Sequence, residues 1–171
     1  MSDRISVLDH GHPVTVTFSS INTYHGGAYP DGIAHALKAM QAAFPVLSER
    51  PLERREVHVL TAYSGAGGRD ALEMVTRAVT GGRIMTDRAI GGVDVLSDPP
   101  GPYVFRFTYR GKTVEASLKP GHVTEEFVAL EQARDKSLDD IARHEELKAE
   151  LANRFLRLSA ADVYAVRLFE G

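Results

Sequence analysis

Strand-like and helix-like segments follow one another along this chain without strict alternation. Apolar residues alternate with polar ones, as in half-buried strands, in segments 14–18, 57–61, 103–109 and 112–118, and Arg110-Gly111 is expected to form a hairpin turn between the last two. They recur at helical spacing in segments 33–44, 72–79, 123–134 and 138–158. A strict alternation would favour a parallel, doubly wound sheet, so the irregular order favours the α+β class. We expect a mixed or antiparallel sheet packed against helices, with a long C-terminal helix followed by a final strand over 163–169.

The size and charge of the chain narrow its organisation and its partners. Its 171 residues suit one domain spanning 1–171. With 20 basic and 23 acidic side chains, a net charge of -3 and no basic block, nucleic acid is not expected as a partner. No apolar run approaches the ~20 residues of a membrane span. No signal-peptide core follows the polar start, so we expect a cytoplasmic protein without a membrane partner.

The chain contains no cysteine. Disulfides, thiolate metal ligands and thiol nucleophiles are therefore excluded. Any metal would have to be bound by histidine, carboxylate or carbonyl groups.

Glycine-rich segments precede two of the predicted helices. We expect a loop over 22–32, with Asp31 capping a helix that ends before Pro45. A second loop over 64–68 leads to Asp70, which has capping-box spacing to Glu73, and Gly81-Gly82 ends that helix.

Four segments together resemble the FmdE family of formylmethanofuran dehydrogenase. The loop HGGAYPD at 25–31 is similar to the family's H-G-H-x-C-P-G loop. Segments 70–78 and 81–85 resemble the family's D-A-I-Q-x-x-T-G-C and G-K-x-N-L motifs. The hairpin end at 114–120 and the closing helix and strand at 155–167 complete a likeness over roughly residues 20–169.

The resemblance implies one-carbon metabolism. The family's activity concerns formyl transfer and CO2 reduction on a pterin-like or furan carrier, within a larger molybdenum or tungsten oxidoreductase complex. It also implies a divalent metal, zinc first. This chain departs from the family at its metal ligands, because Gly27, Tyr29 and Ala78 stand where the family has His, Cys and Cys. Of the usual ligands His25 remains, so the chain resembles a divergent, cysteine-free member.

Three candidate catalytic residues follow: His25 as acid or base, Tyr29 as hydrogen-bond donor, and Asp70 from the middle motif. The candidate ligand-binding residues, which would hold a small or anionic molecule at a helix N-terminus or in an Asp–Arg clamp, are Gly26, Asp31, Arg69 and Arg77. A simpler alternative is that His25 bonds to backbone while Asp31 and Asp70 only cap helices.

A metal site without cysteine would have to be rebuilt from histidines. His10 and His12 would face the same way on an extended chain, and with His58 they are the candidate ligands to join His25. For His58 a surface position is the simpler alternative. His144 is expected to pack in the core or at a dimer interface.

Three functions remain open from the sequence. The first is a small-ligand-binding or catalytic protein, and the second is a metal-binding protein with the rebuilt site. The third is a non-enzymatic accessory protein that has lost its site and acts by assembly. For the third, the apolar side of the C-terminal helix, with His144 and Phe155, offers a surface for a homodimer or a larger complex.

Overall fold

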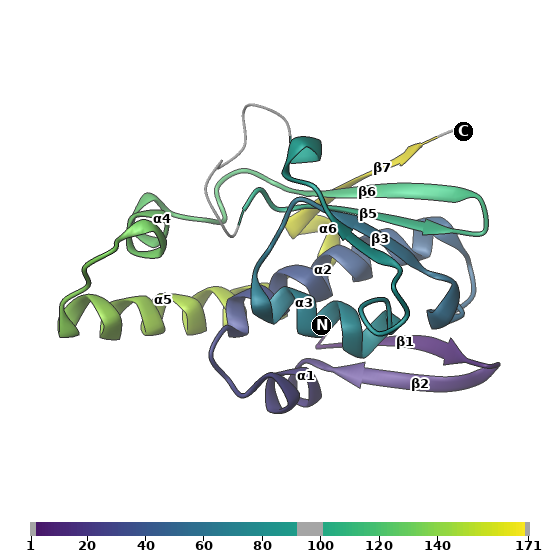
Figure 1. Cartoon of the computed structure of the whole chain (residues 1–171), viewed down its shortest axis with the longest axis horizontal. Coiled ribbons are helices and arrows are strands. Elements are labelled where there is room, and N and C mark those ends of the chain that lie inside the picture. Colours follow the sequence, from purple (N-terminus) through teal and green to yellow (C-terminus); the bar gives the residue numbers. More distant parts are fainter. Residues whose placement is uncertain (1–2, 92–100, 170–171) are drawn as a thin grey trace.

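A five-stranded sheet forms one side of the structure, a computed structural model that describes residues 3–91 and 101–169 (Figure 1). Its strands, in spatial order, are β4 (Ile84–Thr86), β3 (His58–Thr61), β5 (Val104–Tyr109), β6 (Lys112–Leu118) and β7 (Tyr164–Phe169). The β3–β4 pair is parallel and the other pairs are antiparallel. The described residues therefore form a single α+β domain with a mixed sheet, which confirms the predicted fold class.

A separate hairpin precedes the sheet in the chain. It pairs β1 (Arg4–Asp9) with β2 (His12–Thr17). Its turn residues, His10 with φ 50° and Gly11 with φ 81°, are both left-handed, as a two-residue hairpin turn requires. Arg110 and Gly111 form the same kind of turn between β5 and β6. The second turn was predicted from the sequence, whereas β1 was not.

The helices lie mainly on one face of the sheet and at one end of the molecule (Figure 1). They are α1 (Phe18–His25), α2 (Pro30–Leu47), α3 (Ala66–Thr76), α4 (Glu125–Gln132), α5 (Leu138–Arg157) and α6 (Ala160–Val163), with short 3-10 helices η1 (Arg54–Glu56) and η2 (Arg88–Gly91). Side-chain caps fix several starts: Thr17 on α1, Thr124 on α4 and Ser137 on α5.

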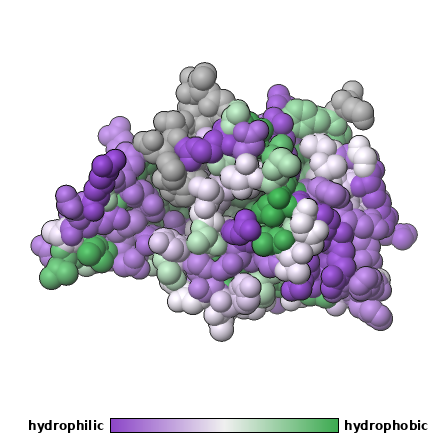
Figure 2. Space-filling view, in the orientation of Figure 1, coloured by the Kyte–Doolittle hydropathy of each residue, from purple (hydrophilic) through white to green (hydrophobic). Residues whose placement is uncertain are grey.

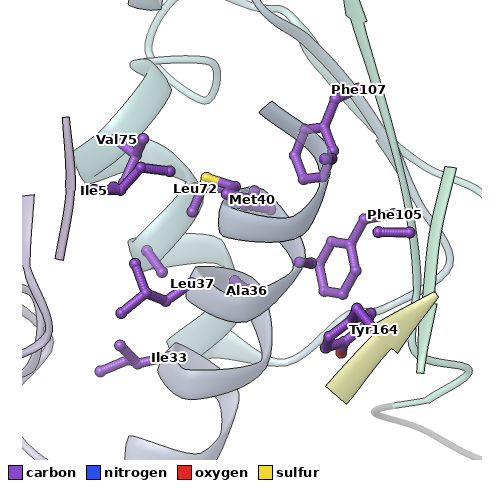
Figure 3. Packing of buried hydrophobic residues seen from close by; sticks show 14 of the residues in the cluster. Ile5, Ile33, Ala36, Leu37, Met40, Leu72, Val75, Phe105, Phe107 and Tyr164 are labelled. Atoms are coloured by element: carbon purple, nitrogen blue, oxygen red, sulfur yellow. The ribbon is translucent and has the colours of Figure 1, made fainter. Parts of the chain in front are cut away.

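The central helix α2 is buried on every side. Every residue from Asp31 to Met40 is buried. Figure 3 shows why: Ile33 and Leu37 point toward the side of α3 and β1, while Phe105 and Phe107 of the sheet pack on the opposite side of the helix. A helix between two layers needs small or apolar residues all round, which explains the alanines at 34, 36, 39 and 43. The single apolar stripe predicted for this helix is therefore too narrow.

Several predicted boundaries in this region are wrong. Residues 22–25 belong to α1, and α2 begins at Pro30 with Tyr29 as its N-cap, so Asp31 lies inside the first turn. Helix α2 also continues through Pro45 to Leu47. A proline so near the end removes one backbone hydrogen bond, and the burial of Phe44 and Leu47 compensates for it.

Helix α3 also differs from its predicted form. It starts at Ala66, so Gly67 and Gly68 are helical and Asp70 lies one turn inside. The proposed Asp70–Glu73 capping box is absent, because the carboxylate of Glu73 instead accepts hydrogen bonds from Thr80. The helix ends at Thr76 rather than at Gly81, since Arg77 adopts the left-handed conformation (φ 57°). The guanidinium of Arg83 then donates to the carbonyl oxygens of Thr76 and Arg77.

Helices α4 and α5 extend from the main body at one end (Figure 1). Along α5, His144, Leu147, Leu151 and Phe155 are buried as the predicted stripe requires. The first turn is exposed, with Leu138 at 85% and Ile141 at 47%. None of the described helices is long and apolar enough to cross a membrane.

Candidate functional site

The C-terminal end of α1 is joined to α3 by a short contact between His25 and Asp70. His25 Nδ1 lies 2.7 Å from Asp70 Oδ2, although the two residues are 45 positions apart in the chain. Gly26, with φ 92°, ends α1 immediately after the histidine in the left-handed conformation that glycine adopts readily. The short connection to Pro30 then starts α2. Two helix ends and a facing helix thus hold the imidazole in place.

The contact with Asp70 fixes what each ring nitrogen of His25 can do. A carboxylate accepts but does not donate, so Nδ1–H is the donor and Nε2 is the acceptor of the neutral imidazole. The imidazole is only 6% exposed, and Nε2 is buried without a hydrogen-bond partner among the described residues. Such an arrangement presents a fixed lone pair, as general bases and metal-ligating histidines do.

Tyr29 lies beside this pair and is half exposed. Its ring centroid is 5.8 Å from that of His25. The Lys148 ammonium from α5 also lies 4.5 Å from the Tyr29 ring centroid, a cation–π contact. Tyr29 therefore connects the His25–Asp70 pair to residues of the C-terminal helices.

Asp31 lies in a cavity next to Tyr29. The cavity has a volume of about 260 Å³ and is lined by Tyr29, Asp31, Tyr63, Ser64, Gly65, Ala66 and Glu131. Asp31 is 3% exposed, and its Oδ1 has no hydrogen-bond partner among the described residues. Burial, aided by the negative charge of Glu131, raises the pKa of Asp31 from 3.8 to about 6, against the opposing charge of Lys148.

Glu131 is held in this cavity by a short chain of contacts within α4, α5 and their connection. His144 Nε2 lies 2.9 Å from Glu131 Oε1, and the ammonium of Lys136 lies 3.2 Å from His144 Nδ1. An ammonium group only donates, so Nδ1 accepts and Nε2–H donates to Glu131. Burial lowers the pKa of His144 against the opposing hydrogen bond and charge of Glu131, and the nearby Lys148 and Lys136 charges add to the lowering, which agrees with a neutral ring.

The remaining predicted ligand-binding residues are not brought to these groups. Arg69 is exposed and lines a different cavity of about 320 Å³, at the ends of β3 and β4. Arg77 ends α3, with its guanidinium 3.7 Å from Glu73. Among the described residues no ion pair joins Asp70 to either arginine, so the predicted Asp–Arg clamp is wrong. Gly26 serves as the left-handed end of α1.

The glycines at 65–68 are explained by packing. A Cβ on Gly67 would lie 2.4 Å from the carbonyl oxygen of Tyr29, and one on Gly68 would lie 2.4 Å from the Tyr63 ring. A Cβ on Gly32 of α2 would lie 2.6 Å from the Tyr63 hydroxyl. These glycines let α2 and α3 approach closely around Tyr63, so they do not form the flexible loop expected from the sequence.

The histidines proposed as metal ligands do not assemble. His10 lies on the β1–β2 turn rather than on an extended chain, with its imidazole 78% exposed, and His58 is exposed on β3. In the part of the chain that the structure describes, no group of three or more His, Cys, Asp or Glu side chains is placed to hold a metal ion. The residues present, including His12, therefore do not fit the family's zinc site within one chain.

Sequence reasoning missed three residues of this region: Tyr63, Glu131 and Lys148. They come from the end of β3, from α4 and from α5, and meet the α1–α2 connection only in the folded chain. Nothing in the local sequence around Glu131 or Lys148 distinguishes them from other charged residues of the predicted helices.

The chain was also compared with known proteins. No family model matches it, and no curated protein matches it.

Proposed function

We propose that this protein binds a small ligand at the His25–Asp70 pair, with His25 Nε2 as the atom that accepts a proton or a hydrogen bond from it. The carrying observation is the buried Nε2 without a partner, in a ring whose other nitrogen is held 2.7 Å from a carboxylate. Leaving a buried acceptor unpaired costs about 1–3 kcal/mol, a cost that a ligand would remove.

Each neighbouring residue has a part in this proposal. Asp70 fixes the ring and its tautomer and would stabilise the imidazolium if a proton were transferred. Tyr29, half exposed beside the ring, supplies a hydroxyl donor to a bound molecule. The same set would serve binding alone or general acid–base catalysis.

The resemblance to the FmdE family of formylmethanofuran dehydrogenase supports ligands from one-carbon metabolism. The ligand class proposed is therefore a group of this metabolism that carries an N–H donor for Nε2, a formamide or the amine of a pterin-like or furan carrier, in the cytoplasm. No metal-dependent step is proposed, because the side chains that the structure describes do not fit the family's metal site.

The test is a titration of ¹⁵N-labelled protein with formamide and with tetrahydrofolate, both of which carry N–H donors, followed by amide and imidazole NMR signals. We expect saturable shifts at residues 25–29 and at Asp70, abolished in His25→Ala and weakened about tenfold in Asp70→Asn. His58→Ala, which removes an exposed histidine of the sheet, is the matched control and should bind as wild type. Identical shifts in wild type and His25→Ala would refute the proposal.

A second candidate function, an accessory role in a larger assembly, is favoured by the exposed start of α5. Leu138 and Ile141 are exposed apolar residues on a helix that projects from the body, and Figure 2 shows apolar surface at this end of the molecule. Exposed apolar groups of this kind mark contact surfaces. For this candidate we propose a homodimer through the start of α5.

Sedimentation velocity over a range of protein concentrations tests this candidate. We expect a dimer for the wild type and a monomer for Leu138→Ser/Ile141→Ser. Met85→Ser, which removes another exposed apolar residue outside α5, should leave the dimer intact. A wild-type protein that stays monomeric at all concentrations would contradict the assembly role.

A further inference from the structure

The cavity that holds Asp31 has features the proposed role of His25 does not use. Neither His25 nor Asp70 lines it. Its walls come from the start of α2, the segment that follows β3, and α4. Two carboxyl groups, Asp31 and Glu131, and two aromatic rings, Tyr29 and Tyr63, meet there.

Among the described residues, Asp31 has no cationic partner close enough to neutralise it. The described ion pairs include none to Asp31, and the ammonium group of Lys148, whose charge acts on Asp31, instead pairs with Glu145 at 2.9 Å. The nearby backbone N–H groups of Asp31 and Gly32 act to lower the pKa of the carboxyl group, yet Oδ1 remains buried and without a partner among the described residues. A carboxylate that is 3% exposed and unpaired is costly to keep unless something else binds to it.

Glu131 adds a second negative charge on the same cavity. Its Oε1 accepts a hydrogen bond from His144, and because that imidazole is neutral the contact leaves the charge of Glu131 in place. Two like charges facing one cavity repel each other, which is one of the reasons the pKa of Asp31 is raised. A bound cation would relieve both the repulsion and the unpaired oxygen.

The aromatic walls favour an organic cation over a metal ion. Tyr29 already has one ammonium group over its ring, that of Lys148 at 4.5 Å, which shows that its face accepts a cation. Metal ions of the calcium or magnesium class take six or more oxygen ligands, and of the described residues that line this cavity only two carry carboxyl groups. Alkylammonium groups combine a positive charge with apolar surface that tyrosine rings can cover.

We infer that the Asp31–Glu131 cavity is a binding site for a small organic ammonium ion, a primary amine or a quaternary ammonium. One charge-assisted contact to Asp31 and a second to Glu131 hold the cation, and Tyr29 and Tyr63 cover its alkyl part. The inference does not depend on the proposed role of His25.

The test compares each cation with a neutral molecule of similar shape. Choline is paired with 3,3-dimethylbutan-1-ol, and propylamine with propan-1-ol, in NMR titrations followed at Tyr29, Asp31 and Tyr63. We expect saturable binding of at least one cation, with its neutral counterpart binding at least about tenfold more weakly.

Variants assign the binding to the cavity. Asp31→Asn and Glu131→Gln should each weaken binding of the cation about tenfold, whereas Glu146→Gln, an exposed acid on α5 that pairs with Arg143, should bind as wild type. Because thermal unfolding of each variant is followed in parallel, a lost signal is assigned to binding only in folded protein. Asp70→Asn should leave cation binding intact, which separates this site from the His25–Asp70 pair.

Three outcomes would overturn the inference. The first is that neither cation binds at concentrations up to about 10 mM, because a formed binding site should give a dissociation constant below that value. The second is that cation and neutral counterpart bind alike. The third is that folded Asp31→Asn and Glu131→Gln both bind as wild type.

Discussion

At the scale of single residues, His35 is a buried histidine whose ionisation opposes folding. It is fully buried on α2, 2.8 Å from the Tyr164 hydroxyl through Nδ1, with its ring stacked on Tyr103 at 4.1 Å. Burial, reinforced by the positive charges of His122 and Arg154, lowers its pKa from 6.5 to about 3.

The shift makes a prediction about acid stability. Below pH 6.5 the unfolded chain binds a proton at His35 that the folded chain refuses until pH about 3. The free energy of unfolding should therefore fall as the pH is lowered from 6.5, with this residue contributing up to about 1.4 kcal/mol per pH unit. Urea unfolding at pH 7, 6 and 5 measures this, and His35→Gln should flatten the slope. A wild type and a variant with parallel pH profiles would show that the pKa of His35 is the same in the folded and the unfolded chain.

The contribution of Asp31 to stability changes with pH in the opposite direction, because its pKa is raised. The folded chain keeps the proton up to pH about 6, whereas the unfolded chain releases it near 3.8. The stabilising contribution of the protonated form is thus complete below pH 3.8 and is lost as the pH rises through 6. The shift corresponds to about 3 kcal/mol.

Asp31→Asn should therefore be more stable than wild type at pH 7.5, by on the order of 2 kcal/mol, since it removes a buried unpaired charge. The difference should shrink at pH 4. Thermal unfolding at the two pH values measures it, with Asp162→Asn, outside the cavity, as the control. A variant less stable than wild type at pH 7.5 would mean that Asp31 is paired in the native protein. A residue retained at a cost to stability is typical of a binding site.

At the scale of elements, the close approach of α2 and α3 depends on glycines packed around Tyr63. A Cβ on Gly32 meets the Tyr63 hydroxyl at 2.6 Å, whereas a Cβ on Gly67 meets the backbone oxygen of Tyr29 at 2.4 Å. We expect Gly32→Ala and Gly67→Ala each to lower the free energy of unfolding by about 1–3 kcal/mol. In a Tyr63→Phe background, the effect of Gly32→Ala should shrink while that of Gly67→Ala stays. If Gly32→Ala lowered the free energy of unfolding equally in the wild-type and Tyr63→Phe backgrounds, the added methyl group would not clash with the Tyr63 hydroxyl.

At the scale of the whole molecule, the sequence predicted the fold class and most strands, but not how the helices and the sheet are arranged in layers. Alternating patterns located β2, β3, β5 and β6, and the Arg110–Gly111 turn, because these signals are local. The predicted boundaries of α2 and α3 were wrong at Pro45 and at the glycines of 65–68. Proline and glycine usually mark helix ends or loops, but here burial keeps Pro45 inside α2 and close helix packing explains the glycines. Because α2 is buried on both sides, its sequence has no single apolar stripe from which its two ends could be predicted.

The candidate site was predicted only in part, because its contacts join residues that lie far apart in the chain. His25 and Asp70 were both named, but through the family resemblance and not through any spacing, since their contact spans 45 positions. Glu131 reaches the cavity from a helix about a hundred positions after Asp31, and long-range contacts of this kind leave no trace in local pattern. The pairing of His10 with His12 as metal ligands assumed an extended chain where the structure has a turn.

The most direct test of the central claim is the protonation pattern of the His25 imidazole, read from ¹⁵N NMR of the free protein near neutral pH. The structure predicts a proton on Nδ1, shared with Asp70, and a lone pair on Nε2, with the preference lost in Asp70→Asn. A signal showing the proton on Nε2, unchanged in Asp70→Asn, would contradict the account, because the atom proposed to meet the ligand would then be a donor.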